Sequence, residues 1–422
     1  MIGLRQRVPP LPSFFGWRVV SAAFVVAAFG YGVGFYGPPV YLYAVQQARG
    51  WSIELVATAV TAHYLVAAAV VATLPALHRR LGLGPATRAG ALALAAGVLG
   101  WSLAAQPWQL FAATLVSGAG WGAVGGATIN AIVSPWFREG RPKALSLAMN
   151  GASMGGIVLS PLWVVAVTSL GFPAAALLIG LVMVVALWIL CDRYVARTPG
   201  EMGLVPDGAA HARTAPPALD QTARPASPSA LRVNRRFVTL VGGMALGYFV
   251  QGGVIAHLFT LLQPAFGPRT AGLAVGFATV CAMGGRTLVG WFMPAGASRR
   301  TVAAASYCLQ ACGCAAFVAS GGTNIPLLLA GVVLVGAGIG NTTSLPPLIA
   351  QAEYADRDVL RVVAWITSLS QASYAFSPAV FGVLRGIAGP SDAVAAVFVV
   401  AAAIWIAGAA CYLAGARLGP RA

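Results

Sequence analysis

The sequence predicts an all-α membrane protein whose twelve transmembrane helices form two pseudo-symmetric bundles of six. Its composition is the first observation: 59% of the 422 residues are hydrophobic and 9% are charged, whereas roughly a quarter of the residues in a soluble domain are charged. The second is that apolar stretches of about 20 residues, the length that crosses a bilayer, recur along the chain. The third is the position of the basic residues between these stretches.

The expected spans fall into two groups of six. The first group covers residues 16–46, 53–77, 86–105, 108–133, 143–170 and 172–195, and the second covers residues 237–263, 270–293, 301–320, 325–350, 359–384 and 393–413. The segment between the groups is rich in proline, alanine and arginine, and such a composition cannot bury a core. We therefore expect an N-terminal bundle over residues 1–196, a cytoplasmic linker over 197–235 and a C-terminal bundle over 236–422.

The basic residues support this count of spans. Of the 26 lysine and arginine residues, all but four fall at the termini, in loops on the same side as the termini, or at the span ends next to them. Arg49, Arg269 and Arg385 lie in the opposite loops, and Arg286 lies inside a span. This asymmetry follows the positive-inside rule and predicts that both termini are cytoplasmic. It also accounts for the net charge of +16 without a nucleic-acid partner.

Four motifs resemble those of a known transporter family. They are GWRVV at residues 16–20, SPWFREGRPKAL at 134–145, GASMGG at 151–156 and RTPGEMGLVPDG at 197–208. With the plan of six and six spans, they resemble the major facilitator superfamily, and within it the branch of monocarboxylate transporters and oxalate/formate antiporters. The resemblance implies a monomer that works by alternating access, with its substrate site between the bundles near mid-membrane.

The chain departs from this pattern in two loops and at one helix position. Residues 78–82 read HRRLG and residues 297–300 read ASRR, so both loops lack the aspartate that the superfamily usually carries there. Ala282 stands where many monocarboxylate transporters have an aspartate four residues before the arginine of helix eight. These departures weigh against an ion-pair latch in the loops.

Arg286 is the most informative single residue. It lies in the apolar run 279–290, which contains no carboxylate to pair with it. An arginine near the middle of a bilayer costs about 2.5–3.5 kcal/mol even on the more lenient scale, and its guanidinium matches the two oxygens of a carboxylate. We expect Arg286 to bind the substrate's carboxylate, the role that the resemblance also implies for it. The alternative is an arginine held by backbone carbonyls at a helix break near Gly284-Gly285.

Two histidines are the candidates for proton coupling. All ten acidic residues fall in loops or at the ends of spans, so no buried carboxylate is expected to carry a proton. His63 and His257 lie inside spans and are titratable near neutral pH. His63 falls at a depth similar to that of Arg286 on the repeat-equivalent helix, which predicts that the two face each other across the cavity. The alternative for each histidine is a packed, neutral, hydrogen-bonded side chain.

Several other polar side chains inside spans are candidates for substrate binding. They are Tyr36 and Tyr41 on either side of Pro38-Pro39, where we expect a break in the helix, Asn150 in the glycine-rich helix, and Ser368, Gln371 and Tyr374, which share a helix face at a spacing of three. Hydrogen bonding between helices is the alternative for each of them.

These residues favour a secondary transporter of small organic anions, mono- or dicarboxylates, working by proton symport or by anion exchange. Drug or metabolite efflux by the same fold remains open, as does a membrane receptor or sensor without transport. We expect neither an enzyme nor a cofactor, and no metal, because the six cysteines have no metal-ligand spacing with histidine. The expected partners are the organic anion, the lipid bilayer and protons if transport is coupled to them. The heavy use of alanine, glycine and arginine indicates a GC-rich bacterial genome and predicts the inner membrane.

Overall fold

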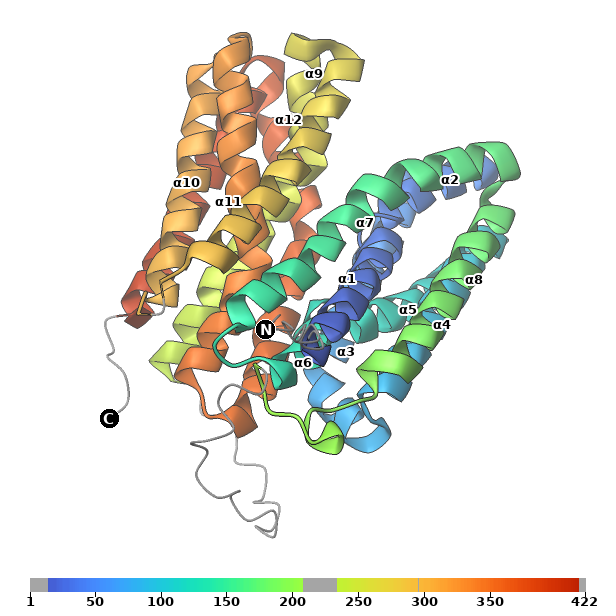
Figure 1. Cartoon of the computed structure of the whole chain (residues 1–422). Coiled ribbons are helices and arrows are strands. Elements are labelled where there is room, and N and C mark those ends of the chain that lie inside the picture. The colour runs from blue at the N-terminus through green and yellow to red at the C-terminus, as the bar shows by residue number, and fades with distance from the viewer. Residues whose placement is uncertain (1–13, 208–233, 295, 417–422) are drawn as a thin grey trace, which may run out of the picture.

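A computed structural model describes residues 14–207, 234–294 and 296–416 (Figure 1). Within these ranges the regular elements are helices, and no strand occurs among them. Eleven of the helical segments described are long and apolar enough to cross a membrane. The predicted all-α membrane fold is therefore confirmed.

Eight α-helices make up the described part of the N-terminal half. They are α1 (Phe15–Gly34), α2 (Pro38–Arg49), α3 (Ile53–Leu81), α4 (Leu83–Leu103), α5 (Pro107–Val124), α6 (Gly126–Val133), α7 (Arg141–Leu170) and α8 (Phe172–Leu190). The first predicted span is broken between α1 and α2, because Pro38 and Pro39 have no backbone N–H to donate to the preceding turn. The fourth predicted span is also broken, between α5 and α6, where Gly125 has an extended backbone conformation.

The C-terminal half consists of four long helices within the described residues. They are α9 (Arg235–Phe292), α10 (Arg299–Ala319), α11 (Ile325–Glu353) and α12 (Asp356–Ala416). The seventh and eighth predicted spans both lie in α9, which turns back at Gly267. There φ is 71°, a left-handed conformation that glycine adopts without steric cost. The eleventh predicted span, 359–384, is helical but is not among the eleven apolar segments, because serine, threonine and glutamine side chains lower its hydropathy.

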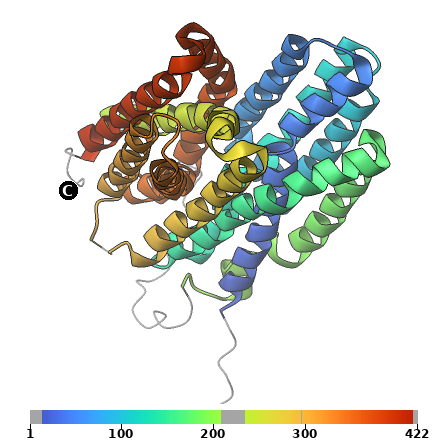
Figure 2. The same ribbon diagram turned by 90° about the horizontal axis from the view of Figure 1, so that it is seen from above.

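The two bundles approach each other at one end and diverge toward the other (Figure 1), and they lie side by side when seen from above (Figure 2). Across the interface, α7 packs on α9 and α3 packs on α12. We call the end of the molecule that carries the start of α1 and residues 197–207 the linker face. The cavity described below lies on the other side of the contact layer.

Residues 197–207 fold back onto the N-terminal bundle through Asp207. Its carboxylate accepts hydrogen bonds from the backbone N–H groups of Arg138 (2.7 Å), Glu139 (2.8 Å) and Gly140 (3.1 Å), just before α7. Its own N–H donates to the Trp136 carbonyl. A carboxylate at this position pairs N–H groups of the loop before α7 and lies favourably near the helix N-terminus. Residues 208–233 of the predicted linker lie outside the described residues.

Replacing Asp207 with alanine should lower the free energy of unfolding by about 1–3 kcal/mol, because three backbone N–H groups lose a charged hydrogen-bond acceptor. The melting temperature of the purified protein in detergent would measure this change. Glu139→Ala, which removes an exposed acid in the same loop, is the matched control and should leave the melting temperature near that of wild type. Equal melting temperatures for the two variants would contradict a stabilising role of the Asp207 carboxylate.

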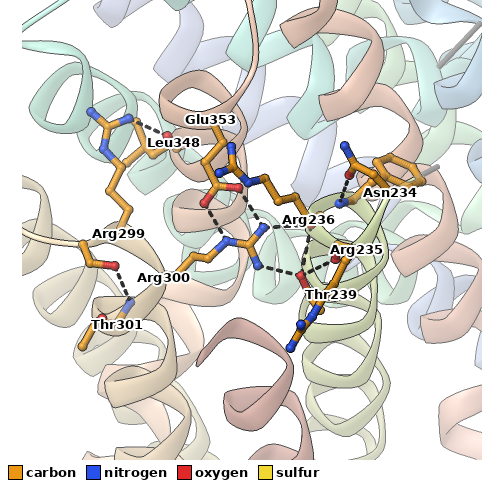
Figure 3. Close-up of polar contacts among 11 residues, drawn as sticks. Asn234, Arg235, Arg236, Thr239, Arg299, Arg300, Thr301, Leu348 and Glu353 are labelled. Atoms are coloured by element: carbon orange, nitrogen blue, oxygen red, sulfur yellow. Dashed lines mark hydrogen bonds and ion pairs between the residues drawn. The ribbon is translucent and has the colours of Figure 1, made fainter. Parts of the chain in front are cut away.

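A buried ion pair joins α10 and α11 at the linker face of the C-terminal bundle (Figure 3). Arg300 is 1% exposed, and its Nε and Nη2 donate to the two carboxylate oxygens of Glu353 at 2.6 and 2.8 Å. Nη1 donates to Thr239 Oγ1, and Nη2 also donates to the Arg236 carbonyl, both on α9. The loop at 297–300 has no acid of its own, but the end of α11 supplies one.

Candidate substrate cavity

A cavity of about 760 Å³ lies between the two bundles. Its wall is largely apolar and aromatic, and Arg286 is the only charged residue among the described residues that line it. The α7 residues in the wall run outward from Ala152 to Pro161. The returning leg of α9 contributes residues from Gly272 inward to Arg286. The cavity therefore extends away from the linker face, with Arg286 at its inner end.

Hydrogen bonds between the bundles close the structure on the linker-face side of Arg286. Ser146 Oγ donates to the Arg286 carbonyl at 2.9 Å, and Asn150 Nδ2 donates to Thr287 Oγ1 at 2.8 Å. Closer to the linker face, Gln351 on α11 donates to Asn130 Oδ1 and Ser134 Oγ in the N-terminal half. The cavity thus has a closed floor.

A cation–π contact belongs to the same closed layer. The Lys143 ammonium lies 3.7 Å from the ring centroid of Trp291 on α9 and 5.6 Å from that of Trp17 on α1. Beside it, Gly290 packs so tightly on α7 that a Cβ there would lie 2.5 Å from Ser146 Cβ. Close approach of α9 to α7 therefore requires glycine at position 290.

Arg286 joins the two bundles and keeps one nitrogen uncommitted. The residue is 4% exposed. Its Nε donates to the Gly340 carbonyl on α11 at 2.8 Å, and its Nη1 donates to the Met149 carbonyl on α7 at 2.8 Å and to Asn150 Oδ1 at 3.1 Å. No hydrogen bond from Nη2 and no carboxylate partner is found among the described residues. Backbone carbonyls do hold this arginine, but they lie on neighbouring helices and not at Gly284-Gly285.

Three tyrosines surround the guanidinium. Tyr31, Tyr36 and Tyr248 lie close enough to Arg286 to interact with it electrostatically, and all three line the cavity. Within the part of the chain that the structure describes, none of their hydroxyl groups has a hydrogen-bond partner. The inner end of the cavity therefore offers a cation and several O–H donors together, which is a favourable environment for an anion.

A comparison with protein families decides which kind of protein this is. The family model for the Major Facilitator Superfamily matches residues 20–378. The chain belongs to the major facilitator superfamily. This transporter is therefore a multi-pass membrane protein, and its family favours transport over a receptor or an enzyme. The sequence matches none of the curated proteins with which it was compared.

Four of the predicted site residues lie in the cavity wall of the transporter. These are Arg286, Tyr36, Gln371 and Tyr374, and Asn150 contacts Arg286 from beside the wall. Ser368 is buried outside the wall and Thr367 lies in it. Steps of three residues drift around a helix with 3.6 residues per turn, whereas positions 367, 371 and 374 stay on one face.

The structure places the other three predicted residues away from the cavity. Tyr41 lies in the core of the N-terminal bundle, where its hydroxyl donates to the Val33 carbonyl and its ring stacks on Phe172. His63 does not face Arg286, because its ring nitrogens lie 2.9 Å from Ser117 Oγ and the Gly34 carbonyl.

His257 lies outside the wall too. Its Nε2 lies 3.1 Å from the Pro378 carbonyl, and its Nδ1 lies 3.0 Å from Arg385. Both histidines therefore have the packed, hydrogen-bonded environment that was the alternative to proton coupling.

The sequence reasoning missed Tyr31, Tyr248 and Gln251 as wall residues of the transporter. A signal was available in their spacing. Tyr31 and Phe35 are four residues apart, and Tyr248 and Gln251 are three apart, so each pair shares a helix face. Gln371 and Tyr374 were predicted from such a spacing, and these residues were predictable in the same way.

Proposed function

We propose that this transporter carries organic anions with a carboxylate group, mono- or dicarboxylates, and binds them at Arg286. One observation carries the proposal: among the described residues, a buried guanidinium at the inner end of the cavity has no acidic partner and makes no hydrogen bond through Nη2. A buried charge is costly unless it is paired. A substrate carboxylate supplies the pairing, and the nearby tyrosine hydroxyls supply further donors.

The charge of the wall disfavours the efflux of cationic drugs. A cation in this cavity would lie near Arg286 without an acidic group among the described wall residues to offset the repulsion. A neutral metabolite could accept a hydrogen bond from the guanidinium but would leave its charge unpaired. An anion is the substrate class that gains from the observed charge.

The hydrogen bonds of Arg286 link substrate binding to alternating access. Its bonds to Met149 and Asn150 on α7 cross the interface between the bundles, so they must break when the bundles separate at the linker face. A bound carboxylate then offers the guanidinium replacement acceptors. We take the linker face to be cytoplasmic in a bacterial inner membrane, as the basic loops predict. Exchange of one anion for another needs no proton carrier, and the location of both histidines outside the wall favours it over symport.

The thermal stability of the purified protein with and without carboxylates tests this proposal. A ligand that binds only the folded state at 100 times its Kd stabilises it by about 2.7 kcal/mol. We expect at least one mono- or dicarboxylate to raise the melting temperature of wild type, to raise it less in Arg286→Lys and not at all in Arg286→Ala.

Arg80→Ala is the matched control, because it removes an exposed arginine at the end of α3 and should respond as wild type does. The proposal fails if Arg286→Ala responds to carboxylates as strongly as wild type.

A further inference from the structure

The size of the cavity is out of proportion to a two- or three-carbon acid. A volume of about 760 Å³ falls within the range of sites that enclose drug-sized ligands. The smallest carboxylates would contact Arg286 and leave most of the wall in contact with water. A larger ligand would cover the rest of the wall as well.

Aromatic rings make up the middle of the wall. The ring of Tyr374 packs on Phe35 at 5.0 Å and on Tyr248 at 6.4 Å between centroids, and Trp121 packs on Tyr31 at 4.7 Å. These rings hold one another in place while lining the cavity. Rigid aromatic surfaces favour a flat ring in the ligand, through stacked or edge-to-face contacts.

Two carboxamides in the wall have a side-chain oxygen without a partner. Gln251 is 8% exposed and Gln371 is 7% exposed, and among the described residues the buried Oε1 of each has no hydrogen-bond partner. Unpaired buried polar groups are rare in folded proteins and call for an explanation. Both side chains line the cavity, so a rotation of each amide would turn its oxygen toward a ligand that donates a hydrogen bond. A carboxamide can both donate and accept, so it suits a hydroxyl or an amide.

The two carboxamides lie at different depths. Ser373 donates to the Ala245 carbonyl and Ser377 to the Phe249 carbonyl, and these bonds fix a constant register between α12 and the first leg of α9. In this register Gln371 lies level with Gly243. Gln251 lies eight residues farther from the linker face, which is about 12 Å along a helix. A ligand that satisfies both groups must be elongated.

We infer that the substrate is an elongated amphipathic carboxylate, with the acid at Arg286, an aromatic ring in the middle and a hydroxyl or amide group at the far end near Gln251. The inference rests on the proposed function for its charged end only. The aromatic ring and the polar far end of the substrate are inferred from the aromatic wall and the unpaired carboxamides. Simple short acids match the charged end but neither of the other two features.

Binding of a graded series of acids to the full-length protein in detergent, measured by calorimetry, tests the inference. The probes are propionate, 3-phenylpropionate, 3-(4-hydroxyphenyl)propionate and the neutral amide of the last compound. On wild type we expect phenylpropionate to bind at least tenfold more tightly than propionate. The phenolic hydroxyl should add about fivefold, and the neutral amide should bind at least tenfold more weakly than its acid.

Gln251→Leu separates a ligand contact from a structural role. This variant removes an unpaired polar group while keeping a similar volume, so it should fold. It should lose the fivefold preference for the hydroxyl and keep the affinity for phenylpropionate. Retention of the hydroxyl preference in this variant would overturn the role of Gln251. Propionate binding as tightly as the ring-bearing acids, or no binding of any ring-bearing acid, would overturn the inference as a whole.

The same series keeps the two proposals apart. Acids that bind through Arg286 regardless of ring size would overturn the inference and leave the anion site standing. Ring compounds that bind Arg286→Ala, or bind as neutral amides, with unchanged affinity would overturn the anion site and leave the aromatic pocket standing.

Discussion

Glu353→Ala is expected to lower the free energy of unfolding by about 3–5 kcal/mol, the usual cost of removing one partner of a buried ion pair. The reason is the burial of Arg300, which is 1% exposed and directs Nε and Nη2 to the carboxylate (Figure 3). The variant leaves that charge inside the bundle, with Thr239 and the Arg236 carbonyl as its remaining hydrogen-bond partners among the described residues. Denaturant or thermal unfolding in detergent would measure the loss.

Two control variants test whether the loss of stability comes from the unpaired Arg300. The double variant Arg300→Met, Glu353→Leu removes both charges and should recover most of the lost stability, since apolar residues often replace buried pairs at little cost. Asp358→Ala breaks the exposed pair with Arg357, whose atoms are 3.7 Å apart, and should change stability by less than about 1 kcal/mol. A loss below about 1 kcal/mol in Glu353→Ala would contradict the expectation.

Gly290→Leu is expected to prevent the bundles from closing at the linker face and to reduce transport at least tenfold. A Cβ at this position would lie 2.5 Å from Ser146 Cβ and 3.1 Å from the Pro142 carbonyl on α7, and packed helices resist such overlap. The contact crosses between bundles, so each bundle can fold unchanged. The distance between spin labels at positions 138 and 357, in a background without native cysteines, should lengthen.

Gly284→Leu is the matched control for this change. It lies on the same leg of α9, and a Cβ there would meet, among the described residues, no atom within 4 Å apart from its chain neighbours and the backbone of its own helix nearby. Its label distances and transport rate should match those of wild type. If Gly290→Leu gives the same label distances as Gly284→Leu, the tight contact at position 290 does not set the closed state.

Much of the fold could be predicted because a bilayer imposes simple rules. Apolar length located the spans, and Pro38-Pro39 located the break in the first of them. Residues 359–384 were predicted as a span with a polar face, and that polarity follows from their position on the cavity, because Thr367, Gln371 and Tyr374 line it. Wall residues at helical spacing were predictable in the same way, although only some were found.

The side-chain contacts between helices could not be predicted from the sequence. His63 and Arg286 were placed at similar depth, but depth does not fix direction. Each residue along a helix rotates the side chain by about 100°, so an error of a few residues in register turns it toward another neighbour. Arg286 was recognised as unpaired by acids, yet its bonds to Gly340 and Met149 depend on how three helices pack. Tyr41 was predicted as a wall residue because it lies near the helix break. The direction in which its side chain points around the helix could not be predicted from the sequence.

The position of Lys143 has a consequence for following the transport cycle. It is the single lysine of the sequence, and its ammonium lies between Trp17 and Trp291 where the bundles meet. An amine-selective reagent therefore has one side-chain target in the whole protein. That target is shielded when the linker face is closed and accessible when the bundles part, so the acylation rate of one native residue reports which side of the membrane the cavity faces.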